Sequence, residues 1–239
     1  MTEANGAVMK TMIATVAKPM LIGLGVILAI DLVVLGMFLR WAYVEHANVT
    51  ESMLYGQLLY SSVDGSLMEI WGYLKELTII GLALYAFLHA KELFYAAYAL
   101  LFLVVLADDS LRLHEHFGAV LSQYAVIGPH GEILAQAILS GIPLALTLLG
   151  MVRLARDRIA PALMLLFGFC VTAFFAVVID KLHEMLIGAA HFQTISTLVE
   201  DGGELISLTL ILAIWGIFGR MIVPHVTIGM IPHDALEVA

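Results

Sequence analysis

Long apolar runs of about 20 residues alternate with short polar segments along most of the chain. A helix of about 20 apolar residues crosses a bilayer core, so these runs predict membrane spans. The predicted spans lie near 19–40, 66–90, 93–118, 133–153, 159–188 and 202–223. The expected fold is therefore all-α: a polytopic membrane protein built as a bundle of about six transmembrane helices.

Turn residues or charge runs mark the connections between these spans, at 61–65, 128–131, 153–158 and Pro224. The first apolar run, Met20 to Leu39, is longer than the hydrophobic region of a signal peptide, so we expect it to stay as the first span. Because six spans with short loops use up 239 residues, we expect one domain over residues 1–239.

The composition agrees with this pattern. Hydrophobic residues make up 62% of the chain and charged residues 13%, whereas about a quarter of a soluble domain is charged. A formal net charge of -9 provides no basic surface, so we expect no nucleic-acid partner and take the lipid bilayer as the surroundings of the chain. The single cysteine, Cys170, lies in an apolar run and excludes an intramolecular disulfide.

The basic residues predict the orientation of the bundle, because positive charges collect on the cytoplasmic side of membrane proteins. Seven of them fall at span ends that alternate to one side: Lys10, Lys18, Lys91, Arg153, Arg156, Arg158 and Arg220. We therefore expect both termini in the cytoplasm and the chain in a bacterial inner (plasma) membrane.

Carboxylates gather at the opposite, non-cytoplasmic ends. Ten of the twenty acids belong to short patches on four predicted helices, namely Glu69, Glu76, Asp108, Asp109, Glu115, Asp180, Glu184, Glu200, Asp201 and Glu204. The topology was deduced from basic residues and apolar lengths without use of the acids. Their convergence at one leaflet is therefore an independent indication of a site, since ionisable groups in membrane segments are expensive and commonly functional.

Helical spacing brings several of these groups onto shared faces. Asp180, His183 and Glu184 stand at i, i+3 and i+4, so that their side chains converge. His114 occurs in a second Leu-His-Glu tripeptide. Whether Asp108 or Asp109 joins His114 stays open, because a helix break between them would change the face.

This combination of acids and imidazoles resembles the ligand arrangement by which di-iron carboxylate bundles hold two metal ions, although only Asp180 and His183 have the expected spacing. Carboxylate oxygen and imidazole nitrogen suit iron, with zinc or manganese as alternatives. The expected ligands are Glu76, Asp108, Asp109, His114, Glu115, Asp180, His183, Glu184, Glu200 and Glu204, of which Glu115 and Glu184 are the expected catalytic acid–base groups.

Charge balance favours bound cations as well. The ten acids have only Lys75, Arg112 and Lys181 near them in the sequence, which leaves about seven negative charges beside a low-dielectric slab. Asp31 lies in the middle of the first span with no obvious partner. The plain alternative is a structural rim of helix-end acids that complement helix dipoles and form ordinary ion pairs.

The leading functional hypothesis is a metal-dependent membrane oxidase or hydroxylase, an oxidoreductase that acts on an apolar, lipid-like or quinone-like small molecule. A zinc-dependent membrane hydrolase would use the same ligand types. A cation- or proton-coupled transporter is the alternative from another class, because intramembrane acids also form proton relays. Two further alternatives are a haem-binding span, with His114 and His183 as axial ligands, and an accessory subunit without chemistry of its own.

Overall fold

The computed structural model describes residues 3–63, 65–124, 126–182 and 193–222. Every regular element in those ranges is helical, and six helices are long and apolar enough to cross a membrane. They are Met20–His46, Leu67–Ala90, Leu93–Leu111, Gly131–Met151, Arg156–Leu182 and Thr194–Gly219. The predicted all-α bundle of six spans is confirmed, and the chain is an integral membrane protein.

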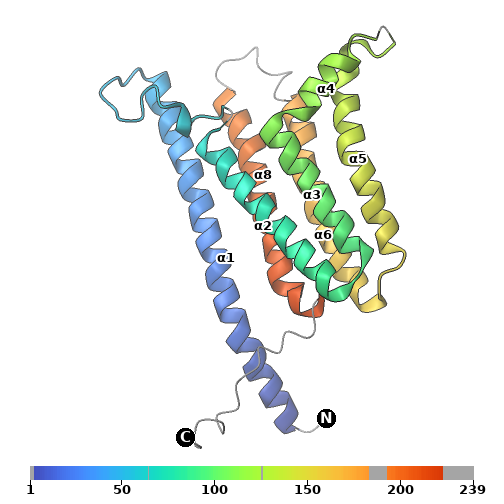
Figure 1. Ribbon diagram of the computed structural model, residues 1–239. Coiled ribbons are helices and arrows are strands. Elements are labelled where there is room, and N and C mark those ends of the chain that lie inside the picture. Colours follow the sequence, from blue (N-terminus) through green and yellow to red (C-terminus); the bar gives the residue numbers. More distant parts are fainter. Residues whose placement is uncertain (1–2, 64, 125, 183–192, 223–239) are drawn as a thin grey trace, which may run out of the picture.

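The six spans form one bundle in which α1 and α5 occupy opposite sides (Figure 1). The helices are α1 (Glu3–His46), α2 (Leu67–Ala90), α3 (Leu93–Leu111), α5 (Gly131–Met151), α6 (Ile159–Ala173) and α8 (Gln193–Ile222). Helix α8 packs against α1, α2 and α6, and α3 packs against α2 and α5. At about 1.5 Å per residue, α1 is longer than a bilayer is thick, and its first part extends past the other helices.

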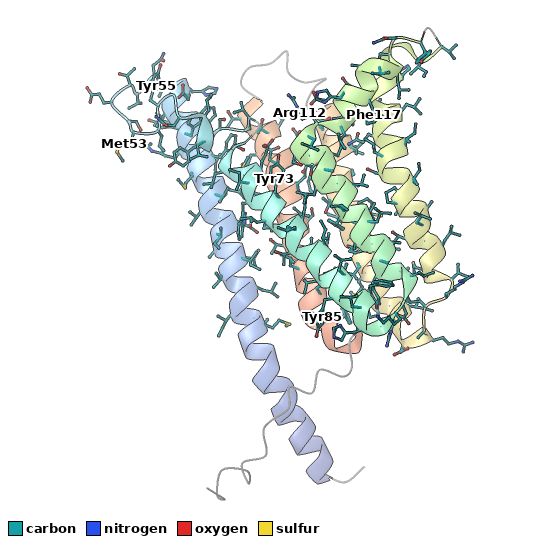
Figure 2. The ribbon with its side chains drawn as sticks, viewed as in Figure 1. Met53, Tyr55, Tyr73, Tyr85, Arg112 and Phe117 are labelled. Atoms are coloured by element: carbon teal, nitrogen blue, oxygen red, sulfur yellow. The ribbon has the colours of Figure 1, made fainter. Side chains whose placement is uncertain are left out.

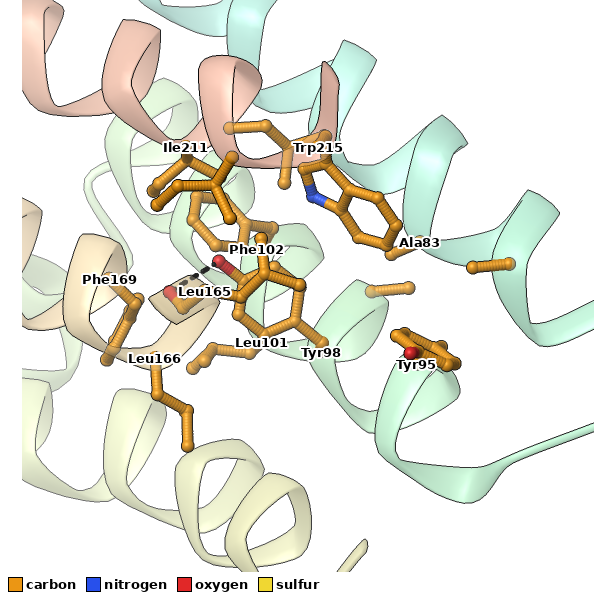
Figure 3. Packing of buried hydrophobic residues seen from close by; sticks show 14 of the residues in the cluster. Ala83, Tyr95, Tyr98, Leu101, Phe102, Leu165, Leu166, Phe169, Ile211 and Trp215 are labelled. Atoms are coloured by element: carbon orange, nitrogen blue, oxygen red, sulfur yellow. Dashed lines mark hydrogen bonds between the residues drawn. The ribbon is translucent and has the colours of Figure 1, made fainter. Parts of the chain in front are cut away.

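A dry aromatic core fills the half of the bundle near the α2–α3 connection. Tyr95 and Tyr98 of α3 lie against Trp215 of α8, with ring centroids 6.0 and 6.5 Å away (Figure 3). The buried Tyr98 hydroxyl donates to the Leu165 carbonyl of α6 at 3.0 Å, which satisfies its one donor. Towards the start of α2 a smaller apolar cluster is formed by Val34, Phe38, Met68 and Leu205, and the polar residues described below collect beside it.

The basic connections and the acidic helix ends lie at opposite ends of the molecule. Lys91, between α2 and α3, and Arg153 and Arg156, between α5 and α6, lie at one end. The start of α2, the end of α3 and the start of α8 lie at the other (Figure 1). The predicted segregation of basic and acidic patches along the bundle axis is therefore present.

One predicted span is shorter than expected. The run 93–118 is interrupted at Arg112, whose φ of 52° is left-handed, and the chain continues as a separate helix α4 (Leu113–Leu121). No glycine or proline marks this break. It is stabilised by Asp108, which accepts a hydrogen bond from the backbone N–H of His114 at 2.7 Å and so caps the start of α4.

Helix α6 also departs from ideal geometry before it ends. Its last α-helical residue, Ala173, leads into a π-helical segment, Phe174–Ile179 (η4), and then into Asp180. The Phe175 ring in this segment lies against Gly203 of α8. A Cβ atom at position 203 would lie only 2.2 Å from the ring. A glycine at 203 therefore allows the close approach of the two segments.

Candidate functional site

A polar cavity of about 260 Å³ opens at the acidic end of the bundle. Residues of α2, α3, α4, α5, the end of the α6 span and α8 line it. Nine carboxylates are among them: Glu69, Glu76, Asp108, Asp109, Glu115, Asp180, Glu200, Asp201 and Glu204. Residues from distant parts of the sequence thus meet at one place, as the topology predicted.

The acids differ in their depth. Glu76 and Asp108 are buried, with 3% and 5% of their surface exposed. Glu200, Asp201 and Glu204 on α8 are half-buried, and Asp109 is exposed along the cavity wall. The most buried carboxylate in the cavity is therefore Glu76 on α2.

Glu76 lacks a hydrogen-bond donor. Its Oε2 atom is fully buried and has no partner among the residues that the structure describes. The side chain instead makes hydrogen-bonding contact with the carboxyl group of Asp109 on α3, and the charge of Glu204 on α8 acts on both. Two carboxyl groups pair directly only through a shared proton or a bound cation.

Asp108 positions His114. The same oxygen, Oδ1, accepts from the His114 backbone N–H and lies 3.0 Å from its ring Nδ1. This hydrogen bond raises the pKa of His114 above its ordinary 6.5, because the carboxylate stabilises the imidazolium. The question left open by the sequence is thereby answered: Asp108, not Asp109, joins His114.

Tyr73 links two walls of the cavity. Its hydroxyl lies 3.0 Å from Glu69 Oε2 and 3.1 Å from the Asp109 carbonyl (Figure 2). Glu69 also accepts from the backbone N–H of Gly65 at 2.7 Å, while Ser66 caps α2 by accepting from the Glu69 N–H. Glu69 therefore has a structural role at the start of α2, of the capping-box kind.

Cations lie at the rim of the cavity. Arg112 pairs with Glu115 at 2.8 Å, three residues further on, and both side chains are exposed. Lys181 lies 3.6 Å from Asp180 and 3.8 Å from Glu132 of α5. These rim pairs contribute little to stability, because water and salt screen them.

Lys75 does not neutralise the cavity, although the sequence suggested that it would. Its ammonium group is paired with Asp31 of α1 on the other side of α2 and also donates to the Leu205 carbonyl at 2.8 Å. Asp31, which seemed to lack a partner, also accepts from the Trp71 indole at 2.6 Å and from the Thr209 hydroxyl at 2.6 Å. The two residues form a buried polar contact among α1, α2 and α8.

Eight of the ten predicted ligands line the cavity; His183 and Glu184 lie outside the described residues. Within the described ranges, no three His, Cys, Asp or Glu side chains stand close enough to form a ready metal site. The cavity thus brings the predicted groups together without gathering them around a single point.

Sequence reasoning missed Tyr73 and Gln136, which also line the cavity. Tyr73 follows Glu69 by four residues, so helical spacing predicts that both side chains lie on the same face of α2. Gln136 had no such signal, because its position depends on how α5 packs against the bundle.

The chain belongs to the family described as Domain of unknown function (DUF8692), whose model matches residues 25–217. The matched range contains every residue that lines the acidic cavity. No curated protein and no solved structure matches the chain.

Proposed function

We propose that the chain is a membrane-embedded, metal-dependent enzyme that acts on an apolar substrate, and that its reaction is an oxidation or hydroxylation. One observation carries this proposal: His114, held by Asp108, stands at a cavity lined by nine carboxylates from several helices. A histidine that ligates a metal commonly has its second ring nitrogen bonded to a carboxylate, which fixes the ring orientation.

The ligand positions follow from this arrangement. With Nδ1 directed to Asp108, Nε2 of His114 is the nitrogen available to a metal ion. Glu76, Asp109 and Glu204 supply carboxylate oxygens at the place where negative charge is least compensated. Iron is the preferred ion for such a set, with zinc and manganese next.

An apolar substrate suits the location of the cavity within a membrane bundle. A zinc-dependent hydrolase remains the closest alternative reaction, because it needs the same ligands and one spare carboxylate as general base. Glu115, which lines the cavity beside His114, is the described residue in the best position for acid–base work.

The cavity is proposed to face away from the cytoplasm. Lys91, Arg153 and Arg156 lie at the opposite end of the bundle, where positive charge favours retention in the cytoplasm. The proposed membrane is the bacterial plasma membrane.

A cation- or proton-coupled transporter is the second candidate. The observation in its favour is the contact between the carboxyl groups of Glu76 and Asp109, an arrangement that also suits a proton carrier. Both candidates require that the cavity binds positive charge, and they differ in whether a metal ion is retained.

Metal analysis of the purified protein decides between them. We expect about one or two transition-metal ions per chain after purification in detergent, as carboxylate-rich bundles hold. The optical spectrum of the same sample would identify a di-iron centre. Folded protein without metal above trace, even after incubation with ferrous iron, zinc or manganese, would overturn the enzyme proposal, and proton uptake by liposomes would then favour the transporter.

A further inference from the structure

A second pocket lies within the membrane region of the bundle, on the other side of α2 from the acidic cavity. Its volume is about 350 Å³, and it lies among α1, α2 and α8. Its lining includes Gly23 of α1, Trp71 and Lys75 of α2, and Trp215 and Gly216 of α8. All of these belong to membrane-spanning segments, so the pocket lies at the depth of the bilayer.

The size and walls of the pocket suit a small, largely apolar molecule. Pockets for small molecules have volumes of about 300 to 1,000 Å³ and mostly apolar walls with few polar groups. A volume of about 350 Å³ holds one ring with a short chain, whereas a two-chain lipid is far larger. The indole of Trp71 provides a flat aromatic wall.

Lys75 is the one charged residue among those that line this largely apolar pocket. An ammonium group has three N–H donors, and in the described part of the chain Asp31 and the Leu205 carbonyl accept two of them. Trp71 lies against the same ammonium group, with its ring 5.5 Å from Nζ. A ligand beside Lys75 is therefore favoured when it presents a hydrogen-bond acceptor, while the charge of Asp31 disfavours an anion.

We propose that this pocket binds a planar, lipid-soluble carbonyl compound of the quinone type, with its carbonyl oxygen at Lys75. This pocket and the acidic cavity are adjacent, because the consecutive α2 residues Lys75 and Glu76 line one each. Leu205 of α8 also connects them, since its carbonyl accepts a hydrogen bond from Lys75 and the residue lines the acidic cavity. That the quinone is the substrate of the enzyme rests on the proposed function. Binding of the quinone in this pocket requires no metal ion.

Tryptophan fluorescence reports on this pocket directly. The chain has three tryptophans, and two of them, Trp71 and Trp215, line the pocket. In a Trp41→Phe background we would titrate purified protein with a benzoquinone that has a single isoprenoid unit. We expect saturable quenching with unchanged excited-state lifetimes, which distinguishes bound quencher from collisions in the micelle.

Two glycines of α1 provide a matched pair of variants. Gly23 lines the pocket and Gly25 does not, while a Cβ on either would meet no atom within 4 Å. Gly23→Leu fills the pocket and should raise the half-saturating quinone concentration by about tenfold or more, since steric overlap is costly. Gly25→Leu should change it by less than about twofold, as a lipid-facing substitution does.

The outcomes separate this proposal from the previous one. Equal quenching in the Gly23→Leu and Gly25→Leu proteins, both shown to be folded by thermal melting, would overturn the pocket proposal. Lipids brominated in mid-chain also quench tryptophan fluorescence when their chains lie beside the ring. If such lipids quench Trp71 and Trp215 and added quinone does not reduce that quenching, the pocket holds a lipid chain and the quinone proposal is overturned. Metal content measured on the same samples reports on the enzyme proposal alone.

Discussion

The backbone N–H and the ring Nδ1 of His114 both lie within hydrogen-bonding distance of one oxygen of Asp108, at 2.7 and 3.0 Å. One carboxylate thus starts α4 and fixes the orientation of the imidazole. Because a left-handed residue, Arg112, precedes the new helix, the histidine turns back towards the residue six positions earlier. The ligand position and the helix break are therefore one structural feature.

Asp108→Asn should separate these two roles. Asparagine still caps a helix, so α4 should persist, but the charge that favours the imidazolium is lost. We expect the pKa of His114, followed by NMR in metal-free protein, to fall towards 6.5. Because the folded pKa is raised, the stability that this pair contributes is fully present below 6.5 and is lost as the pH rises through the raised value.

The control for this experiment is Asp157→Asn, at the opposite end of the bundle. It should leave the His114 titration unchanged. An unaltered His114 pKa in the Asp108→Asn protein would contradict the assignment of Asp108 as its partner.

Asp31 and Lys75 should behave as a coupled pair. Both side chains are buried, with 1% and 2% of their surface exposed, so Asp31→Leu leaves an uncompensated ammonium group within the bundle. Loss of one partner of a buried pair costs about 3 to 5 kcal/mol. The double variant Asp31→Leu with Lys75→Met should be much less destabilised than either single variant predicts, because no charge then remains buried.

Unfolding in detergent, measured for the wild type and the three variants, gives the coupling free energy. Thr209→Val is a useful companion, since it removes one hydrogen bond to the Asp31 carboxylate without removing either charge and should cost about 1.5 to 3 kcal/mol. Additive effects of the two charge substitutions would show that Asp31 and Lys75 do not interact in the folded protein.

Glu76 and Glu204 should act as a unit if they share a cation. Glu76→Gln and Glu204→Gln should each remove most bound metal and most of the effect of chelator on thermal stability, and the double variant should add little. Glu51→Gln, an exposed acid in the α1–α2 connection, should change neither quantity. Small, additive effects without chelator sensitivity would instead indicate a structural acidic rim.

The orientation of the bundle can be tested by cysteine labelling in a Cys170→Ala background. Val126 is 99% exposed beyond α4, and Ala155 is exposed between α5 and α6 at the other end. Val126 is preferred to Gly128, whose φ of 52° disfavours a side chain. An impermeant reagent should label Val126→Cys but not Ala155→Cys in intact cells; the reverse pattern would place the acidic cavity in the cytoplasmic leaflet.

The apolar runs predicted the number of spans and about half of their limits, because hydrophobic length determines what crosses a bilayer. The last span begins at Thr194 and not at 202, because polar residues continue its helix towards the cavity. The span predicted at 66–90 is observed at Leu67–Ala90. Convergence of the acidic patches also followed from the sequence, since an alternating topology places every second helix end on the same side. These inferences need only local patterns and the up-down connection of helices.

Contacts between helices could not be obtained in this way. Lys75 lies 44 residues from Asp31, and the apolar pattern does not state which face of α2 meets α1. The break at Arg112 depends on a side-chain cap from Asp108, in a segment without glycine or proline to mark it. The catalytic roles expected for Glu115 and Glu184 stay predictions, and Glu184 lies outside the described residues.

The π-helical segment Phe174–Ile179 determines how the position of Asp180 responds to a change in chain length. Such a segment contains one residue more than an α-helix needs over the same rise, and Asp180 at its end lines the cavity. Deletion of a single residue within it would restore regular α-helical winding and leave Asp180 on about the same side of the helix axis, because the wide turn absorbs the extra residue. The same deletion in a regular α-helix would rotate every later residue by about 100°. Loss of one codon in this segment should therefore leave Asp180 at the cavity, so the length of this helix can vary by one residue without moving the acid.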